Sequence, residues 1–63
     1  MCESSVYLVY DKGKEKIMDE ALLIEDEGDK LVIVGILGER KEIKEAKIVK
    51  LDMNKHEVLI SKK

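Results

Sequence analysis

The feature that most restricts the fold is the spacing of the apolar residues, which come in short bursts separated by turn-forming clusters. Residues 6–10 (VYLVY) are β-branched and aromatic, which is typical of a strand. Residues 31–37 (LVIVGIL) form a nearly continuous apolar run, as in strands that are covered on both faces. Clusters of Gly, Asp, Asn and Lys interrupt the bursts at short intervals. The sequence therefore predicts an all-β domain.

The remaining predicted strands are shorter and less distinctive. They are residues 17–18, 21–24, 41–43, 45–51 and 57–60. The Ala and Leu residues of 21–24 also favour helix, but we favour a strand because the burst is short and an acidic, Gly-containing cluster stops it. Gly35, inside the long apolar run, indicates a bend or bulge such as a small barrel needs at its corners. We expect about five to seven short strands in a small antiparallel barrel or rolled sheet, since closure removes unpaired edges.

The chain is short for a self-sufficient core. Its 63 residues make a single β-domain spanning residues 1–63, and a core of that size offsets the entropy of folding with little to spare. One Cys excludes an internal disulfide, and the absence of Trp and Phe leaves an aliphatic core. We therefore expect a homodimer.

Charge and hydropathy exclude several classes of function. Fourteen acidic and twelve basic residues give a net charge of −2, whereas a protein that binds nucleic acid through phosphate contacts is normally basic. No apolar run approaches the roughly 20 residues of a membrane span, and no signal peptide is visible at the start. We expect a cytoplasmic protein with a reduced, free thiol and no membrane association.

Cys2, directly after the initiator Met, is the one unusual candidate for chemistry. Removal of Met1 would leave an α-amine and a thiolate that form a five-membered N,S chelate, and an untrimmed chain would still offer the thiolate and nearby amide nitrogens. Square-planar sites of nitrogen and thiolate are characteristic of Ni(II) or Cu(II), and ligand chemistry alone also leaves zinc open. One N,S pair is half of such a site, so a two-fold dimer would supply the other half. The alternative is an incidental Cys2.

The other polar residues form no site that the sequence reveals. His56 has no second His or Cys at ligand spacing, which predicts a solvated turn residue. The acidic residues at 25–29 lack the alternating oxygen ligands of a calcium loop. Lys12, Lys14 and Lys16 alternate along one exposed face. No nucleophile and base are paired, so we expect no catalytic residues and no enzyme.

The chain also resembles a known family. The start MCESSVYL (residues 1–8) is similar to that of the small CooT-type nickel-binding proteins, and residues 28–31, 36–39 and 48–52 are similar to their body. The Met-Cys start at this chain length is the discriminating part. The resemblance implies a compact β-domain that forms a homodimer, Ni(II) bound through Cys2, and a nickel chaperone that serves a nickel enzyme such as carbon monoxide dehydrogenase or its maturation factors.

Two functions thus remain to be compared. The first is Ni(II) binding and delivery through Cys2 at the two-fold axis of the dimer. The second is a small β-barrel that binds RNA or another protein, in which Cys2 is incidental. The acidic balance of the chain and the lack of a basic, aromatic stripe count against RNA.

Overall fold

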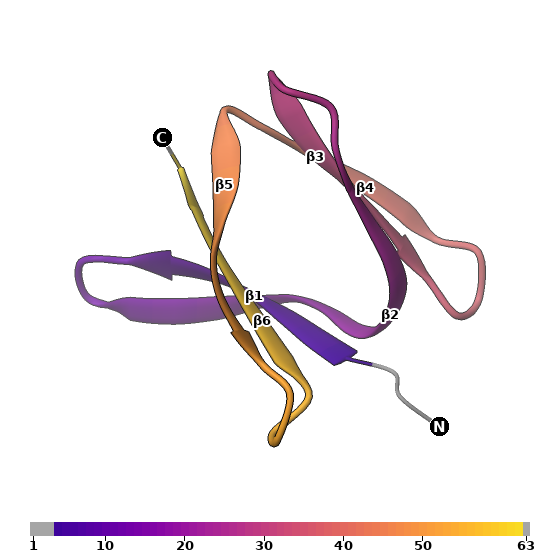
Figure 1. The fold of residues 1–63 in the computed structure, drawn as a ribbon, viewed down its shortest axis with the longest axis horizontal. Helices are drawn as coiled ribbons and strands as arrows, with labels where there is room; N and C mark the ends of the chain where they lie inside the picture. Colours follow the sequence, from indigo (N-terminus) through magenta and orange to yellow (C-terminus); the bar gives the residue numbers. More distant parts are fainter. Residues whose placement is uncertain (1–3, 63) are drawn as a thin grey trace.

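The computed structural model describes residues 4–62 and, within them, six strands joined by short turns (Figure 1). The strands are β1 (Ser4–Tyr10), β2 (Gly13–Asp26), β3 (Lys30–Gly35), β4 (Arg40–Lys44), β5 (Ala46–Asp52) and β6 (Glu57–Lys62). The prediction of an all-β domain with five to seven strands is confirmed. No helix in the described range has the length and apolarity of a membrane span.

The six strands form one mixed sheet in the order β4-β3-β2-β1-β6-β5. Every neighbouring pair is antiparallel except β1 and β6, which run parallel from Ser5 beside Glu57 to Leu8 beside Ile60. The prediction of a purely antiparallel sheet is therefore wrong. The last strand returns beside the first, which places both strand starts at one end of the molecule.

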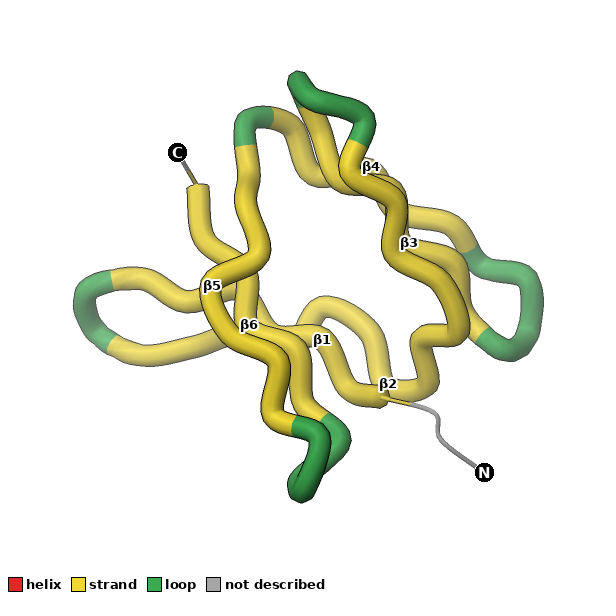
Figure 2. The backbone as a smooth tube through the Cα atoms, viewed as in Figure 1, coloured by secondary structure: helices red, strands yellow, loops and turns green. Residues whose placement is uncertain are grey.

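β2 replaces two strands that the sequence predicts separately. Residues 17–18 and 21–24 belong to one strand of 14 residues, because nothing between them forces a turn. The first half of β2 pairs with β1 and the second half with β3, with register shifts on both sides of Ala21. An irregular strand bends and twists more strongly, and this bend rolls the sheet around the core (Figure 2).

The sheet rolls up but does not close. β4 and β5 are its two edges, and they are consecutive strands joined at Glu45. Glu45 has a φ of 51° and its amide donates to the carbonyl of Asp29 at 2.7 Å. The chain therefore turns a sharp corner there instead of continuing as a hairpin. A rolled sheet is thus confirmed, whereas a closed barrel is not formed.

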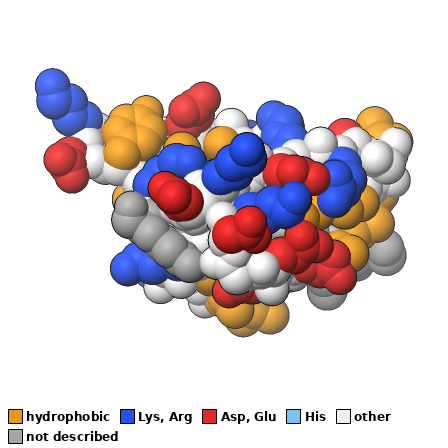
Figure 3. Space-filling view, turned by 90° about the horizontal axis from the view of Figure 1, so that it is seen from above, with side chains coloured by type: hydrophobic (Ala, Val, Ile, Leu, Met, Phe, Trp, Pro, Cys, Tyr) orange, Lys and Arg blue, Asp and Glu red, His pale blue; other side chains and the backbone are white. Residues whose placement is uncertain are grey.

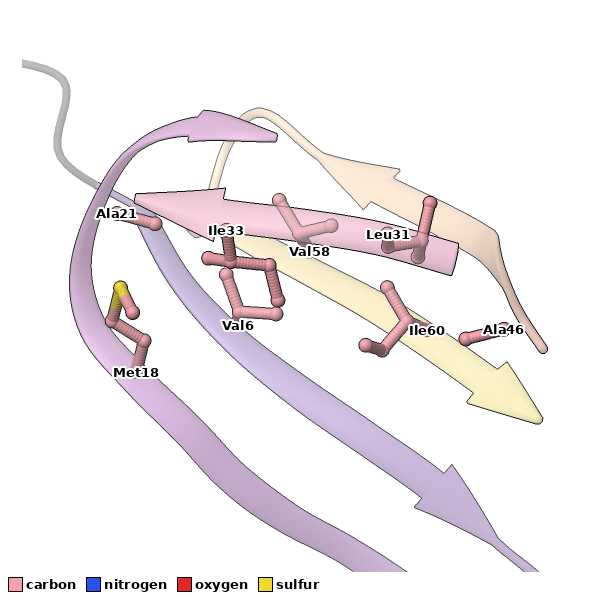
Figure 4. Close-up of a cluster of buried hydrophobic side chains, with 8 residues drawn as sticks. All are labelled: Val6, Met18, Ala21, Leu31, Ile33, Ala46, Val58 and Ile60. Carbon is pink, nitrogen blue, oxygen red and sulfur yellow. The ribbon is translucent and has the colours of Figure 1, made fainter. Parts of the chain in front are cut away.

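The core lies inside the roll and is entirely aliphatic apart from one Met (Figure 4). Its buried members are Val6, Met18, Ala21, Leu31, Ile33, Ala46, Val58 and Ile60. β3 is buried on both faces, as its apolar run predicts, because Val32 faces away from Leu31 and Ile33 yet is only 2% exposed. In β5, by contrast, Ile48 and Leu51 pair with the buried Ile60 and Val58 but remain 40% and 57% exposed.

The apolar run ends as a strand earlier than the sequence predicts. β3 stops at Gly35, and residues 36–39 form a turn in which Ile36 and Leu37 are exposed. A Cβ atom at position 35 would lie only 2.5 Å from the carboxyl carbon of Glu39. The carboxylate of Glu39 occupies that space and accepts a hydrogen bond from the amide of Leu37 at 3.0 Å. Gly35 therefore ends the strand, and the expected bend occurs there.

Opposite charges alternate on the outside of the roll (Figure 3). On β4 and its neighbour β3, Glu42 lies between Lys30, whose Nζ is 3.2 Å away, and Arg40. Hydrogen bonds from Lys30 and Arg40 hold the pKa of the Glu42 carboxyl below its usual value. Solvent-exposed ion pairs of this kind contribute little to stability, and their main effect is to keep this edge of the sheet polar.

Candidate functional site

The predicted metal ligand, Cys2, lies outside the described residues, so the structure shows the scaffold from which it extends. β1 begins at Ser4, which pairs with Ala21 on β2. On the other side the amide of Ser5 donates to the carbonyl of His56 at 2.9 Å. The first residues of β1 are therefore fixed between two neighbouring strands.

A loop of residues 53–56, between β5 and β6, forms one side of this end of the molecule. The carboxylate of Asp52 accepts hydrogen bonds from the amides of Lys55 at 3.0 Å and Asn54 at 3.1 Å, which closes the loop. The hydrogen bond from Lys55 is the main reason why the pKa of Asp52 lies below its ordinary value. His56 ends the loop with a φ of 56° and an exposed side chain.

The turn of residues 36–39, between β3 and β4, forms the other side. Its first amide, that of Ile36, donates to the carbonyl of Glu20 at 2.8 Å, next to the residue that pairs with Ser4. The amide of Gly38 donates to the carbonyl of Gly35 at 3.0 Å, and the Gly38 φ of 87° suits a residue without a Cβ. The turn is thus anchored to the strand that holds the start of β1.

A cleft of about 500 Å³ lies between this turn and the start of β1. It is lined by Ser5, Asp19, Glu20, Leu37 and Glu39. The Ser5 hydroxyl donates to the carbonyl of Asp19 at 3.1 Å. Three of the five lining residues carry carboxylates, so the surface beside the chain start is acidic.

One ammonium group partly offsets this charge. The Nζ of Lys16 lies 2.7 Å from Oδ1 of Asp19, and that hydrogen bond raises the pKa of Lys16. Glu20 and Glu39 have no ion-pair partner within the described part of the chain. The cleft therefore keeps a net negative charge.

The other predicted candidates are dispersed. In residues 25–29 the carboxylate of Asp26 accepts the amide of Gly28 at 2.9 Å, as in a simple turn. Lys14 and Lys16 lie 4.4 and 5.8 Å from the ring centre of Tyr7, on an exposed face as expected. Among residues 4–62 no three His, Cys, Asp or Glu side chains gather closely enough to hold a metal ion.

Sequence reasoning missed the position of His56. It places the residue in a loop, as found, but gives no sign that the loop lies beside the start of β1. That proximity follows from the parallel pairing of β1 and β6, for which hydrophobic pattern alone supplies no signal.

A second groove lies at the opposite end of β1 and β6. It has a volume of about 720 Å³ and is lined by residues from β1, β5, β6 and the β1–β2 turn, among them Leu8, Tyr10, Val49 and Lys62. It is open and largely apolar, and no set of converging polar groups marks it as a catalytic centre.

Comparison with known proteins gives consistent results. The sequence profile of the family described as CO dehydrogenase accessory protein CooT matches residues 1–61, which include Cys2. A crystal structure assigned to CooT from Carboxydothermus hydrogenoformans superimposes with a TM-score of 0.88 at 26% identity, covering 98% of both chains. An uncharacterized protein from Methanocaldococcus jannaschii is 28% identical over 60 residues, which is 95% of this chain and 96% of that protein.

Proposed function

The chain belongs to the CooT family of CO dehydrogenase accessory proteins, and from that premise we propose that it binds Ni(II) through Cys2 and delivers it to a nickel enzyme. The recipient is carbon monoxide dehydrogenase or a factor of its maturation, in the cytoplasm. The chain itself carries out no catalysis, and nickel is its cargo. The observation that carries this proposal is the family match over residues 1–61, together with the Met-Cys start.

The donor set suits a metal that is handed on. A thiolate and a main-chain nitrogen favour a square-planar ion such as Ni(II). Each protomer offers one Cys2 sulfur and nitrogen atoms of the chain start, so two protomers complete four ligands around one nickel at the two-fold axis. A site formed by the first residues of a chain can release its ion by ligand exchange, as delivery requires.

The scaffold supports this arrangement. Cys2 precedes Ser5 by three residues, so its Cα lies within about 11 Å of the Ser5 Cα whatever the path of the chain. Since Ser5 is hydrogen-bonded to His56, the ligand is tethered closely to a rigid part of the sheet. Such a short tether limits the positions that two Cys2 side chains can take in a dimer.

A homodimer is supported by the apolar surface of the protomer. Large apolar side chains that remain substantially exposed include Leu22, Val49, Leu51 and Met53. A small core with this much exposed apolar surface is stabilised by association. Size-exclusion chromatography with light scattering at micromolar concentration should give twice the mass of the chain, and a monomer would refute the shared site.

A nickel titration with two variants tests the proposed site. Wild type should bind one Ni(II) per dimer, with a thiolate-to-metal absorption band that is lost in Cys2→Ser, while circular dichroism shows the same folded sheet. His56→Ala, which removes the single His of the chain without removing a proposed ligand, should bind as wild type does. Retained affinity in Cys2→Ser, or one nickel per chain with dependence on His56, would show that the site is elsewhere.

The same titration distinguishes the second function. A folded dimer that binds no nickel would favour an interaction module with an incidental Cys2.

A further inference from the structure

β5 is an edge strand that the fold leaves unprotected. It has a neighbouring strand, β6, on one side only. The other edge strand, β4, carries the ion pairs of Glu42, and charged side chains of this kind discourage an edge from pairing with a further strand. β5 instead exposes Ile48, Val49 and Leu51, which are 40%, 55% and 57% accessible. An edge with exposed apolar side chains is a template for another strand.

The side chains of β5 follow a pattern that is the same from either end of the strand. Residues that pair directly across a sheet point to the same face. Ile48 and Leu51 pair with two buried residues of β6, so both point into the roll, whereas Lys47 and Asp52 pair with the residues of β6 that alternate with these and point outward. The register shift between Ile48 and Lys50 inserts one extra residue, which puts Ile48 and Leu51 on one face.

This pattern fits a second copy of the same strand. If two copies of β5 run antiparallel about a two-fold axis between Val49 and Lys50, Lys47 of each copy lies opposite Asp52 of the other on the outer face. Residues 48 and 51, both apolar, lie opposite each other on the inner face. An axis at Val49 or at Lys50 would set outward residues opposite inward ones. An axis one residue nearer the start of the strand would set Lys47 opposite Lys50, which like charges oppose.

The charges of β5 favour the same register. Lys47 and Asp52 would form two ion pairs, one on each side of the axis. The pKa of the Asp52 carboxyl is lowered first by the Lys55 amide and also by the charge of Lys50, so each Lys50 already has a carboxylate of its own copy nearby. Exposed ion pairs contribute little affinity, so they select the register, while main-chain hydrogen bonds and apolar contacts hold the strands together.

We propose that β5 pairs antiparallel with β5 of a second copy, in the register whose two-fold axis lies between Val49 and Lys50. β6 and β5 of both copies then separate the two β1 strands. This contact therefore differs from the one at which two Cys2 side chains share a nickel, and it joins one such dimer to the next. A contact through one strand of seven residues is smaller than a standard interface, so it forms at concentrations above those at which the dimer forms.

Disulfide cross-linking tests the register without nickel. In a Cys2→Ser background, one preparation carries Ile48→Cys and another carries Leu51→Cys. The mixture should form covalent pairs under mild oxidation, because opposed residues of antiparallel strands lie about 5 Å apart at Cα, within reach of a disulfide. Each preparation alone should cross-link several-fold more slowly, because equivalent positions are offset by about 10 Å along the strands. Leu37→Cys, on the exposed β3–β4 turn, mixed with Ile48→Cys is the matched control for random collision.

Sedimentation velocity of the wild type tests the charge pairing. A concentration series up to about 1 mM should show the dimer converting to a larger species. Lys47→Glu should move this association to several-fold higher concentration, because the new carboxylate meets Asp52 of the second copy. Lys12→Glu makes the same change of net charge in the β1–β2 turn and should associate as wild type does.

Each outcome supports or overturns the contact. Cross-linking of the mixture no faster than the control would overturn it and leave the edge to a strand of a different protein. Faster cross-linking of Ile48→Cys with itself would overturn the register. No larger species up to about 1 mM, or equal weakening by Lys47→Glu and Lys12→Glu, would also overturn the proposal. Failure of the wild type to bind nickel would reject the proposed function and leave this contact standing, since the cross-linking is done without Cys2.

Discussion

Ile33 offers the clearest test of how this small core is stabilised. It lies on β3 between Ile24 of β2 and Lys41 of β4, its side chain points into the roll, and it is 0% exposed (Figure 4). Ile33→Ala removes three carbon atoms from a site that the neighbouring strands enclose, so the surrounding structure can close the space only in part. Substitutions of this kind cost about 2–5 kcal/mol, and full burial places this one at about 3–4 kcal/mol.

That loss is large for this chain. A domain of 63 residues is expected to be stable by about 3–9 kcal/mol, so Ile33→Ala removes between a third and all of the free energy of unfolding. Ile33→Val deletes one methyl group and should cost about 1 kcal/mol. Leu23→Ala, at an outward position that is 48% exposed, should cost less than about 1 kcal/mol.

Urea denaturation followed by far-UV circular dichroism gives the measurement. All variants must be compared at one protein concentration, because association of protomers adds to the apparent stability. A loss below about 1 kcal/mol for Ile33→Ala, or equal losses for Ile33→Ala and Leu23→Ala, would refute the view that the inside of the roll is the stabilising core.

Three further predictions concern the polar groups. Because Lys30 and Arg40 lower the pKa of Glu42, the stabilising effect of this carboxylate should be present above the ordinary carboxyl pKa of 4.5 and be lost as pH falls through the lowered pKa of the folded state. The urea midpoint of a Glu42→Gln variant should therefore fall less than that of wild type between neutral pH and about pH 3. An identical fall in the two proteins would contradict this. Gly35→Ala should displace the Glu39 carboxylate and break its hydrogen bond with the Leu37 amide, which should lower the free energy of unfolding by about 1 kcal/mol. A crystal structure of the variant with that hydrogen bond intact would contradict this. Nickel affinity should fall as pH drops, since the Cys2 thiol and any amide or amine ligand must lose protons on binding; calorimetry in two buffers of different ionisation enthalpy should detect the released protons, and a flat pH profile would exclude thiolate ligation.

The sequence by itself determined the fold class, most strand positions and the family. Alternating and continuous apolar runs placed β1, β3, β5 and β6 to within a few residues, because burial on a pleated strand imposes that pattern. The Met-Cys start pointed to the family that the profile match establishes. Cys2 as the nickel ligand remains a prediction, since it lies outside the described residues.

Only the tertiary structure decided how the strands are arranged. Pairing between β1 and β6 joins the first strand to the last, and an apolar pattern is the same whether a neighbour runs parallel or antiparallel. Likewise the run of residues 31–37 shows no boundary at Gly35, because what ends the strand is the Glu39 carboxylate that occupies the space a Cβ would fill. The exposure of Leu37 and the closeness of His56 to Ser5 both follow from these long-range contacts, which local sequence does not encode.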